Sequence, residues 1–316
     1  MPINADKPHL WKQDILQSVD LFNRWFMKFA PKAFRDTRIR VTKQVEEALL
    51  LTDDLRGLSP ALLQSHPRIL PTLRMCTCPP LARDRLIGLS GAGKSLVGTM
   101  EAGSIPPRMP SSLLAENLAR IVRIISRMLD KDILPWIGGR RPATDVERHR
   151  ASTIVADRLC GSISDPIIRN AQEKRQLAIM AVYLKRKGYQ QQAPPAGQPL
   201  VAMQPGTFAF RLNVVVGDTR KVKLPIDVVI QLKVPRKSRL PILVEAKSAG
   251  DFTNVNKRRK EEATKMHQLR ATYGDGVEFI LLLCGYFDSG YLGYEAAEGI
   301  DWIWEHRLSD LDLLGI

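Results

Sequence analysis

The stretch Leu224–Lys247, LPIDVVIQLKVPRKSRLPILVEAK, carries the pattern on which the fold of this chain rests. Two apolar runs are joined by a basic turn, which is the pattern of two neighbouring strands. Asp227 lies in the first run, and Glu245 and Lys247 lie at the end of the second. Because side chains two apart in a strand point to the same face, we expect Glu245 and Lys247 to lie side by side, close to Asp227.

Two carboxylates and an ammonium at this place are suited to the hydrolysis of a phosphodiester. Carboxylate oxygens are ligands that Mg²⁺ prefers, and Mg²⁺ keeps several waters of its own. A bound metal would neutralise a phosphate and lower the pKa of the attacking water. Lys247 would orient that water or stabilise the charge that develops.

The residues Pro225-Ile226-Asp227 and Glu245-Ala246-Lys247 resemble the PD-(D/E)XK signature of metal-dependent nucleases. One residue separates the Pro from the Asp, but the Asp carries the chemistry. The resemblance implies a metal site at Asp227, Glu245 and Ala246, with Lys247 positioning the nucleophilic water. The bland alternative is a solvated strand edge, because Glu and Lys two apart are common there.

The surrounding pattern favours the nuclease. Alternating residues predict a strand over Phe208–Val216, a second over Val222–Leu232 and a third over Pro241–Lys247. A polar helix over Asn254–Tyr273 and an apolar strand over Val277–Cys284 follow. This crossover makes the last strand parallel to the Glu245 strand. We therefore predict an α/β (α+β) fold: a PD-(D/E)XK core with a mixed sheet flanked by helices.

A large helical region precedes this core. Apolar residues at helical spacing predict a helix from Leu10 that ends at Pro31 and a second helix from about Thr37 to Leu55. Further helices are expected over the ranges Ser111–Leu134, Asp145–Cys160 and Ile167–Lys187. The predicted division is 1–162, a helical region for scaffold, dimerisation or DNA recognition, and 163–316, the nuclease core.

Glu173 is a candidate fourth catalytic residue. It lies near the start of the last of these helices, among Arg, Gln and Lys. The nuclease resemblance implies that a helix before the catalytic hairpin adds one more acid to the metal site. The alternative is an exposed helix carboxylate.

The charge of the chain indicates a polyanionic partner. Lys and Arg number 47 against 33 Asp and Glu, a net charge of +14, and nucleic acid is the default partner for such an excess. Basic and amide residues in the predicted loops and beside the site form the pool for DNA contacts. They are Arg140, Arg141, Arg236, Lys237, Asn254, Asn256, Lys257 and Arg258.

The segment Gly88–Ser95, GLSGAGKS, matches the Walker A pattern, but its context argues against nucleotide binding. A P-loop follows a buried strand, whereas the charged run Arg83–Ile87 before this segment predicts a helix or loop. We therefore expect no bound nucleotide. A glycine-rich connection in which Lys94 contacts a DNA phosphate is the alternative.

The number of cysteines indicates a reducing compartment, and hydropathy indicates no segment that enters a membrane. Four scattered cysteines are too few for a disulfide framework. No apolar run is long enough for a signal sequence or a membrane span. These features predict a cytoplasmic protein.

Three further segments carry a more specific resemblance: PPLARDRLIGLSG (79–91), RNAQEKRQL (169–177) and EAAEGIDWIWEHRLSDL (295–311). They are similar to type II restriction endonucleases of the XamI kind. The resemblance implies a bacterial, Mg²⁺-dependent enzyme that cuts both strands of a short palindromic DNA site, of the GTCGAC type. A palindromic site implies two-fold symmetry of the protein, hence a homodimer.

Three other functions stay open from the sequence. A repair or junction nuclease of the same fold would show no sequence preference. A non-catalytic DNA-binding protein would ignore Mg²⁺. A P-loop NTPase would bind ATP and lose that binding when Lys94 is replaced by Ala.

Overall fold

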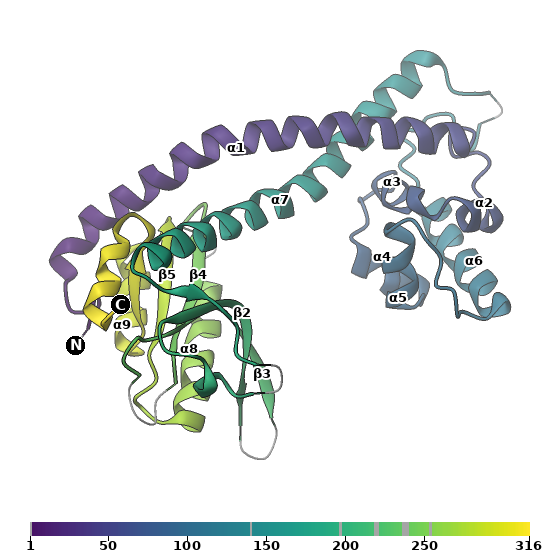
Figure 1. Ribbon diagram of the computed structural model, residues 1–316. Helices are drawn as coiled ribbons and strands as arrows, with labels where there is room; N and C mark the ends of the chain where they lie inside the picture. The colour runs from purple at the N-terminus through teal and green to yellow at the C-terminus, as the bar shows by residue number, and fades with distance from the viewer. Residues whose placement is uncertain (1, 140, 196–197, 218–220, 236–239, 253–254) are drawn as a thin grey trace. The chain divides into compact units, whose positions relative to one another are not determined.

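The computed structural model describes residues 2–139, 141–195, 198–217, 221–235, 240–252 and 255–316, with the backbone alone over 255–258. The chain forms two compact units (Figure 1). Unit 1 comprises residues 1–29 and 169–316, and unit 2 comprises residues 30–168. The structure differs from the predicted division mainly at the N-terminus, because residues 1–29 pack with the C-terminal sheet.

Unit 1 is built on a six-stranded mixed sheet with the strand order β1-β2-β3-β4-β5-β6. Strands β2, β3 and β4 form the predicted antiparallel meander, and β5 lies parallel to β4 as the crossover requires. The sequence pattern had not predicted β6, which lies parallel to β5. The bounds are β1 Gln190–Gln191, β2 Thr207–Val216, β3 Val222–Gln231, β4 Ile242–Ala249, β5 Phe279–Gly285 and β6 Asp301–Trp304.

Helices cover both faces of this sheet (Figure 1). One face packs against α8, α9 and the first turns of α1, and the other packs against the C-terminal part of α7 and η3. This double cover explains why β5 is apolar throughout and buried at every residue. The bounds are α8 Val255–Tyr273, α9 Ser289–Ala297, η2 Leu200–Ala202 and η3 Glu305–Leu314. The predicted α/β fold with a mixed sheet and a preceding helical region is confirmed.

Two long helices correct the predicted boundaries. Helix α1 runs unbroken over Pro8–Leu51 and contains Pro31, where the sequence predicts an end. Helix α7 runs over Asp145–Arg186 and contains Pro166, where the sequence predicts a new start. A proline inside a helix removes one hydrogen bond and costs about 3 kcal/mol. Each helix packs into two hydrophobic cores, and that burial outweighs a single lost bond.

Unit 2 is helical and has its own core around the buried Trp136. Its shorter helices are α2 Pro60–Ser65, η1 Pro67–Ile69, α3 Leu70–Met75, α4 Arg83–Ser90, α5 Lys94–Glu101 and α6 Ser111–Met128. The Walker-like segment joins α4 to α5, so a helix stands where a P-loop has a strand. Helix α6 ends at Met128, six residues before the predicted Leu134, and a turn follows.

The N-terminal segment is fastened to the end of the chain within unit 1. The main-chain amides of Asn4 and Ala5 donate hydrogen bonds to Asp301 at 3.0 and 3.1 Å. The indole of Trp11 packs edge-on against Trp302, with ring centroids 5.5 Å apart. Within the described ranges, no helix is long and apolar enough to cross a membrane.

Candidate active site

Three of the four predicted catalytic residues, Asp227, Glu245 and Lys247, lie where β3 and β4 stop pairing. The paired positions of these strands end at Val228 and Val244. Asp227 and Glu245 are the next residues beyond that last pair. The main-chain amide of Ala246 donates a hydrogen bond of 2.8 Å to Oδ2 of Asp227. The Asp227 carboxylate thus takes the place of a strand carbonyl and ties β3 to β4 at the site.

The alternation along β4 sets the orientation of the site. Leu243 packs into the core on the α8 face of the sheet, whereas Ile242 and Val244 pack into the core on the α7 face. Glu245 and Lys247 share the side of Leu243. The predicted arrangement of the strand is therefore confirmed, and both charged side chains are directed towards α8.

Glu245 is held by two ammonium groups. Lys265 of α8 binds Oε1 of Glu245 at 2.6 Å, and Lys247 lies 3.3 Å from the same oxygen. The other oxygen, Oε2, is buried and has no hydrogen-bond partner among the described residues. An unpartnered buried carboxylate oxygen is costly, so this atom is the one available to a cation.

Lys247 lies between two acids. Its ammonium is 3.3 Å from Glu245 and 3.2 Å from Oε1 of Glu262, a fully buried residue of α8. Burial acts to lower the pKa of Lys247, but Glu262 and Glu245 outweigh that effect and raise it. Lys247 therefore carries a positive charge at neutral pH.

The environment of Asp227 is crowded with negative charge. Burial and then the charge of Glu245 raise the pKa of Asp227, while the bond from Ala246 opposes them. The charge of Glu173 raises it further. Two carboxylates that repel each other in this way would be stabilised by a divalent cation between them.

Glu173 lies on α7 and forms an ion pair of 2.8 Å with Arg211 of β2. Arg211 has a positive φ of 56°, which is uncommon for a residue with a side chain. It stands at the unpaired position opposite Asp227, between the pairs Phe210–Val228 and Leu212–Ile226. Sequence reasoning missed Arg211, because alternation alone does not reveal an unusual backbone angle.

The donor set fits a small hard cation. It offers the carboxylates of Asp227 and Glu245, and Ala246 can add only its main-chain carbonyl. Among the described residues no group of three or more His, Cys, Asp or Glu could hold a metal ion. Two carboxylates are nevertheless sufficient for Mg²⁺, which completes its shell with water and phosphate oxygens.

Most of the predicted DNA-contact residues fall outside what the structure describes. Residues Arg140, Arg236, Lys237 and Asn254 lie outside the described residues, and for Asn256, Lys257 and Arg258 only the helical backbone is described. Arg141 is described. Its guanidinium binds Glu147 at 2.7 and 2.5 Å, and this bond, first among several, lowers the pKa of Glu147 to about 2.

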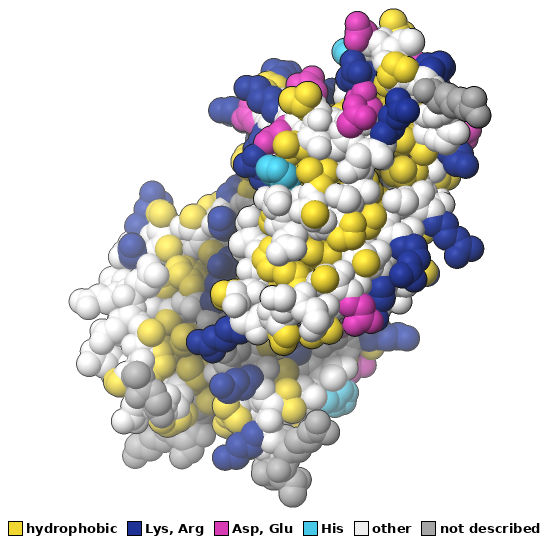
Figure 2. Space-filling view, turned by 90° about the vertical axis from the view of Figure 1, so that its right-hand side faces the viewer, with side chains coloured by type: hydrophobic (Ala, Val, Ile, Leu, Met, Phe, Trp, Pro, Cys, Tyr) yellow, Lys and Arg dark blue, Asp and Glu magenta, His cyan; other side chains and the backbone are white. Residues whose placement is uncertain are grey.

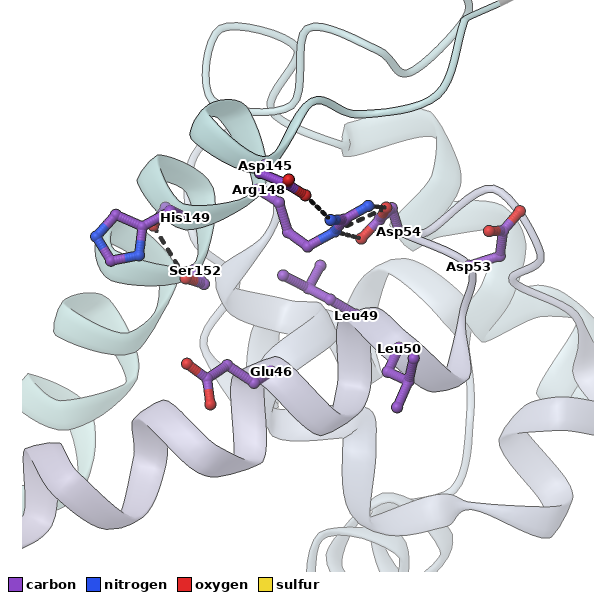
Figure 3. Close-up of a pocket in the computed structure, with 9 residues that line it drawn as sticks. All are labelled: Glu46, Leu49, Leu50, Asp53, Asp54, Asp145, Arg148, His149 and Ser152. Carbon is purple, nitrogen blue, oxygen red and sulfur yellow. Dashed lines mark hydrogen bonds and ion pairs between the residues drawn. The ribbon is translucent and has the colours of Figure 1, made fainter.

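A cavity of about 550 Å³ lies within unit 2 (Figure 3). Arg148 lies in it between Asp54 and Asp145 and forms ion pairs of 2.7 and 2.9 Å with them. Glu46 and Asp53 add acids to the lining. With its cation neutralised, this cavity is a poor site for a phosphate.

Three helix residues complete the polar cluster and were missed by sequence reasoning. Lys265 binds Glu245, Glu262 contacts Lys247, and the hydroxyl of Tyr291 donates a bond of 2.7 Å to Oε2 of Glu262. The polar composition of the predicted helix Asn254–Tyr273 gave no signal of a buried acid. Only the packing of α8 against β4 identifies it.

Comparison with known proteins identifies the family of this chain. Residues 53–304 match the family model described as XamI restriction endonuclease. The chain is 54% identical over 313 residues to the type II restriction enzyme SalI of Streptomyces albus G, covering 99% of both chains. No solved structure matches the chain. The chain belongs to the XamI restriction endonuclease family and is a type II restriction endonuclease.

Proposed function

We propose that the protein cleaves both strands of DNA at a short palindromic site of the GTCGAC type, in a Mg²⁺-dependent reaction. The meeting of Asp227, Glu245 and Lys247 where β3 and β4 part carries this proposal. The family membership supports the sequence-specific restriction activity. The site sequence rests on the family resemblance.

The residues divide the work of hydrolysis. Asp227, Glu245 and the carbonyl of Ala246 would hold Mg²⁺, and Glu173 is placed to act on the same region through its charge on Asp227. When bound, the metal supplies charge neutralisation at the phosphate and a more acidic water. Lys247 stays charged, orients the attacking water and stabilises the charge that develops on the phosphate oxygens.

Lys265 would also act in this reaction, through its contact with Glu245. It neutralises Glu245 in the structure through a contact of 2.6 Å. A cation at Glu245 would compete with this ammonium, because both need the same carboxylate. Lys265 thus limits the repulsion between Glu245 and Asp227 until the metal binds.

The wider surface suits DNA. Lys and Arg side chains are spread widely over the face shown in Figure 2, in agreement with the net charge of +14. We propose double-stranded DNA as the partner and a homodimer as the active form, since a two-fold site is cut by two related centres. We also propose that the enzyme works in the bacterial cytoplasm, where its DNA substrate is found.

One digestion experiment tests the proposal. Sequenced phage DNA is incubated with the protein in Mg²⁺ or in EDTA and separated on a gel. Discrete Mg²⁺-dependent fragments that end at GTCGAC-type sites are expected, and Lys247→Ala is expected to abolish them while DNA binding in Ca²⁺ persists. A smear would indicate a non-specific nuclease, and retarded but intact DNA would indicate a binding protein.

A further inference from the structure

A buried acid of α8 lies beside Lys247. Glu262 of α8 has no solvent exposure, and its Oε1 is 3.2 Å from the Lys247 ammonium. Its neighbour in the sequence, Glu261, is exposed. One turn of polar helix thus places one carboxylate in water and buries the next against the proposed catalytic ammonium.

Glu262 is itself fixed by α9. The Tyr291 hydroxyl donates a hydrogen bond of 2.7 Å to its Oε2, and Tyr291 is 1% exposed. Glu295, also fully buried, lies against Glu262. Burial and the adjacent charge of Glu262 raise the pKa of Glu295 to about 9. Glu295 is therefore neutral at pH 7.

Burying Glu262, Glu295 and the Lys247 ammonium together costs free energy of folding. Two buried carboxyls and a lysine lose their hydration, and apolar residues of similar volume are often neutral or more stabilising at such a place. A buried ion pair does, however, fix the geometry of its partners. The cost is understandable if the position of the Lys247 ammonium matters to the protein.

Lys247 contacts both Glu245 and Glu262, and only Glu262 would keep that contact when a cation binds Glu245. Lys247 and Lys265 both approach the same oxygen of Glu245. When Glu245 is engaged by a cation, its hold on Lys247 weakens, because the charge that attracts the ammonium is then neutralised. Glu262 cannot reach the solvent and keeps its partner. It would anchor the ammonium through the reaction.

We propose that Glu262, braced by Tyr291 and Glu295, is a positioning residue that holds the Lys247 ammonium at the proposed metal site. The inference rests on the proposed catalytic role of Lys247. It assigns a function in cleavage to a residue of α8 that lies outside the PD-(D/E)XK motif.

The test compares Glu262→Gln with Glu261→Gln, a matched control one residue away on the exposed face. Single-turnover cleavage of a duplex with one site is measured in Mg²⁺, and the Kd for the same duplex is measured in Ca²⁺. Glu262→Gln is expected to slow cleavage by about 10–100-fold, the usual effect of losing an outer supporting contact. Its Kd and the properties of the control should stay at the wild-type level.

The outcomes separate this inference from the proposed function. If Glu262→Gln cleaves as fast as Glu261→Gln while Lys247→Ala is inactive, the positioning role is refuted and the catalytic site stands. If Lys247→Ala itself cleaves normally, the proposed site fails. Should Glu262→Gln not fold, Tyr291→Phe removes one brace without burying a new polar group. Slower cleavage with unchanged Kd then supports the inference, and wild-type cleavage refutes it.

Discussion

The buried carboxyl of Glu295 makes the stability of unit 1 depend on pH. Its pKa rises from 4.5 to about 9, first because it is buried and then because Glu262 lies beside it. Between these values the unfolded chain has released the proton and the folded chain still holds it. The unfolded state therefore binds fewer protons, and the free energy of unfolding falls as pH rises.

The magnitude follows from the proton count. One proton of difference changes the free energy of unfolding by about 1.4 kcal/mol per pH unit. Between pH 6 and pH 8, both inside the window, the ionisation of Glu295 in the unfolded chain should lower the free energy of unfolding by about 3 kcal/mol. Replacement of Glu295 by Gln keeps the shape of the side chain and removes the titration. The variant should therefore gain about 3 kcal/mol relative to wild type over the same interval.

Urea denaturation followed by tryptophan fluorescence measures this difference. Trp11, Trp25, Trp302 and Trp304 all lie in unit 1, and Trp136 lies in unit 2, so the signal reports mainly on the unit that contains Glu295. Other titrating groups cancel when wild type and Glu295→Gln are compared at each pH. A difference between the two proteins that stays constant from pH 6 to pH 8 would show that Glu295 does not titrate as described.

Three further substitutions are expected to have distinct effects. Gly285→Ala should destabilise unit 1 by at least about 3 kcal/mol in urea denaturation, because φ is +103° and a Cβ would lie 2.1 Å from the carbonyl oxygen of Ala249. Arg307→Ala should cost roughly 3 kcal/mol in the same assay, because it leaves Asp14, 3% exposed at its side chain, without the guanidinium that binds it. Asp227→Asn should abolish cleavage in Mg²⁺ while DNA binding in Ca²⁺ is retained, because the one oxygen of the amide accepts the hydrogen bond from the main-chain amide of Ala246 and the NH₂ group, which cannot bind a metal, replaces the other oxygen.

Each of these predictions has a result that would contradict it. Gly98→Ala is the matched control for the glycine, because a Cβ added at Gly98 in α5 would have no neighbour within 4 Å. It should be neutral or stabilising by roughly 0.5–1 kcal/mol. Equal stability of Gly285→Ala and Gly98→Ala would show that the backbone at Gly285 adapts. Wild-type stability of Arg307→Ala would show that Asp14 reaches water, and normal cleavage by Asp227→Asn would remove Asp227 from the metal site.

Local sequence patterns were enough to predict strands β2 to β5 of the sheet and the side of β4 on which Glu245 and Lys247 lie. Alternation over residues 208–247 predicted three antiparallel strands, and the polar helix before an apolar strand predicted the parallel β5. The spacing of Glu245 and Lys247 put both on one face. These are local consequences of a period of two residues and of the rule for crossovers, so no knowledge of distant contacts was needed.

The surroundings of those residues depend on tertiary packing, which the sequence pattern did not reveal. Helix α1 continues past Pro31, because the burial of its apolar residues on both sides of the proline outweighs one lost hydrogen bond. Tertiary packing also buried Glu262 against Lys247 and placed Lys265 on Glu245. A periodic pattern shows which face of an element is apolar but not which partner covers it. The polar contacts that position the site depend on how α8 and α9 pack over β4, and that packing is set by the whole core of unit 1.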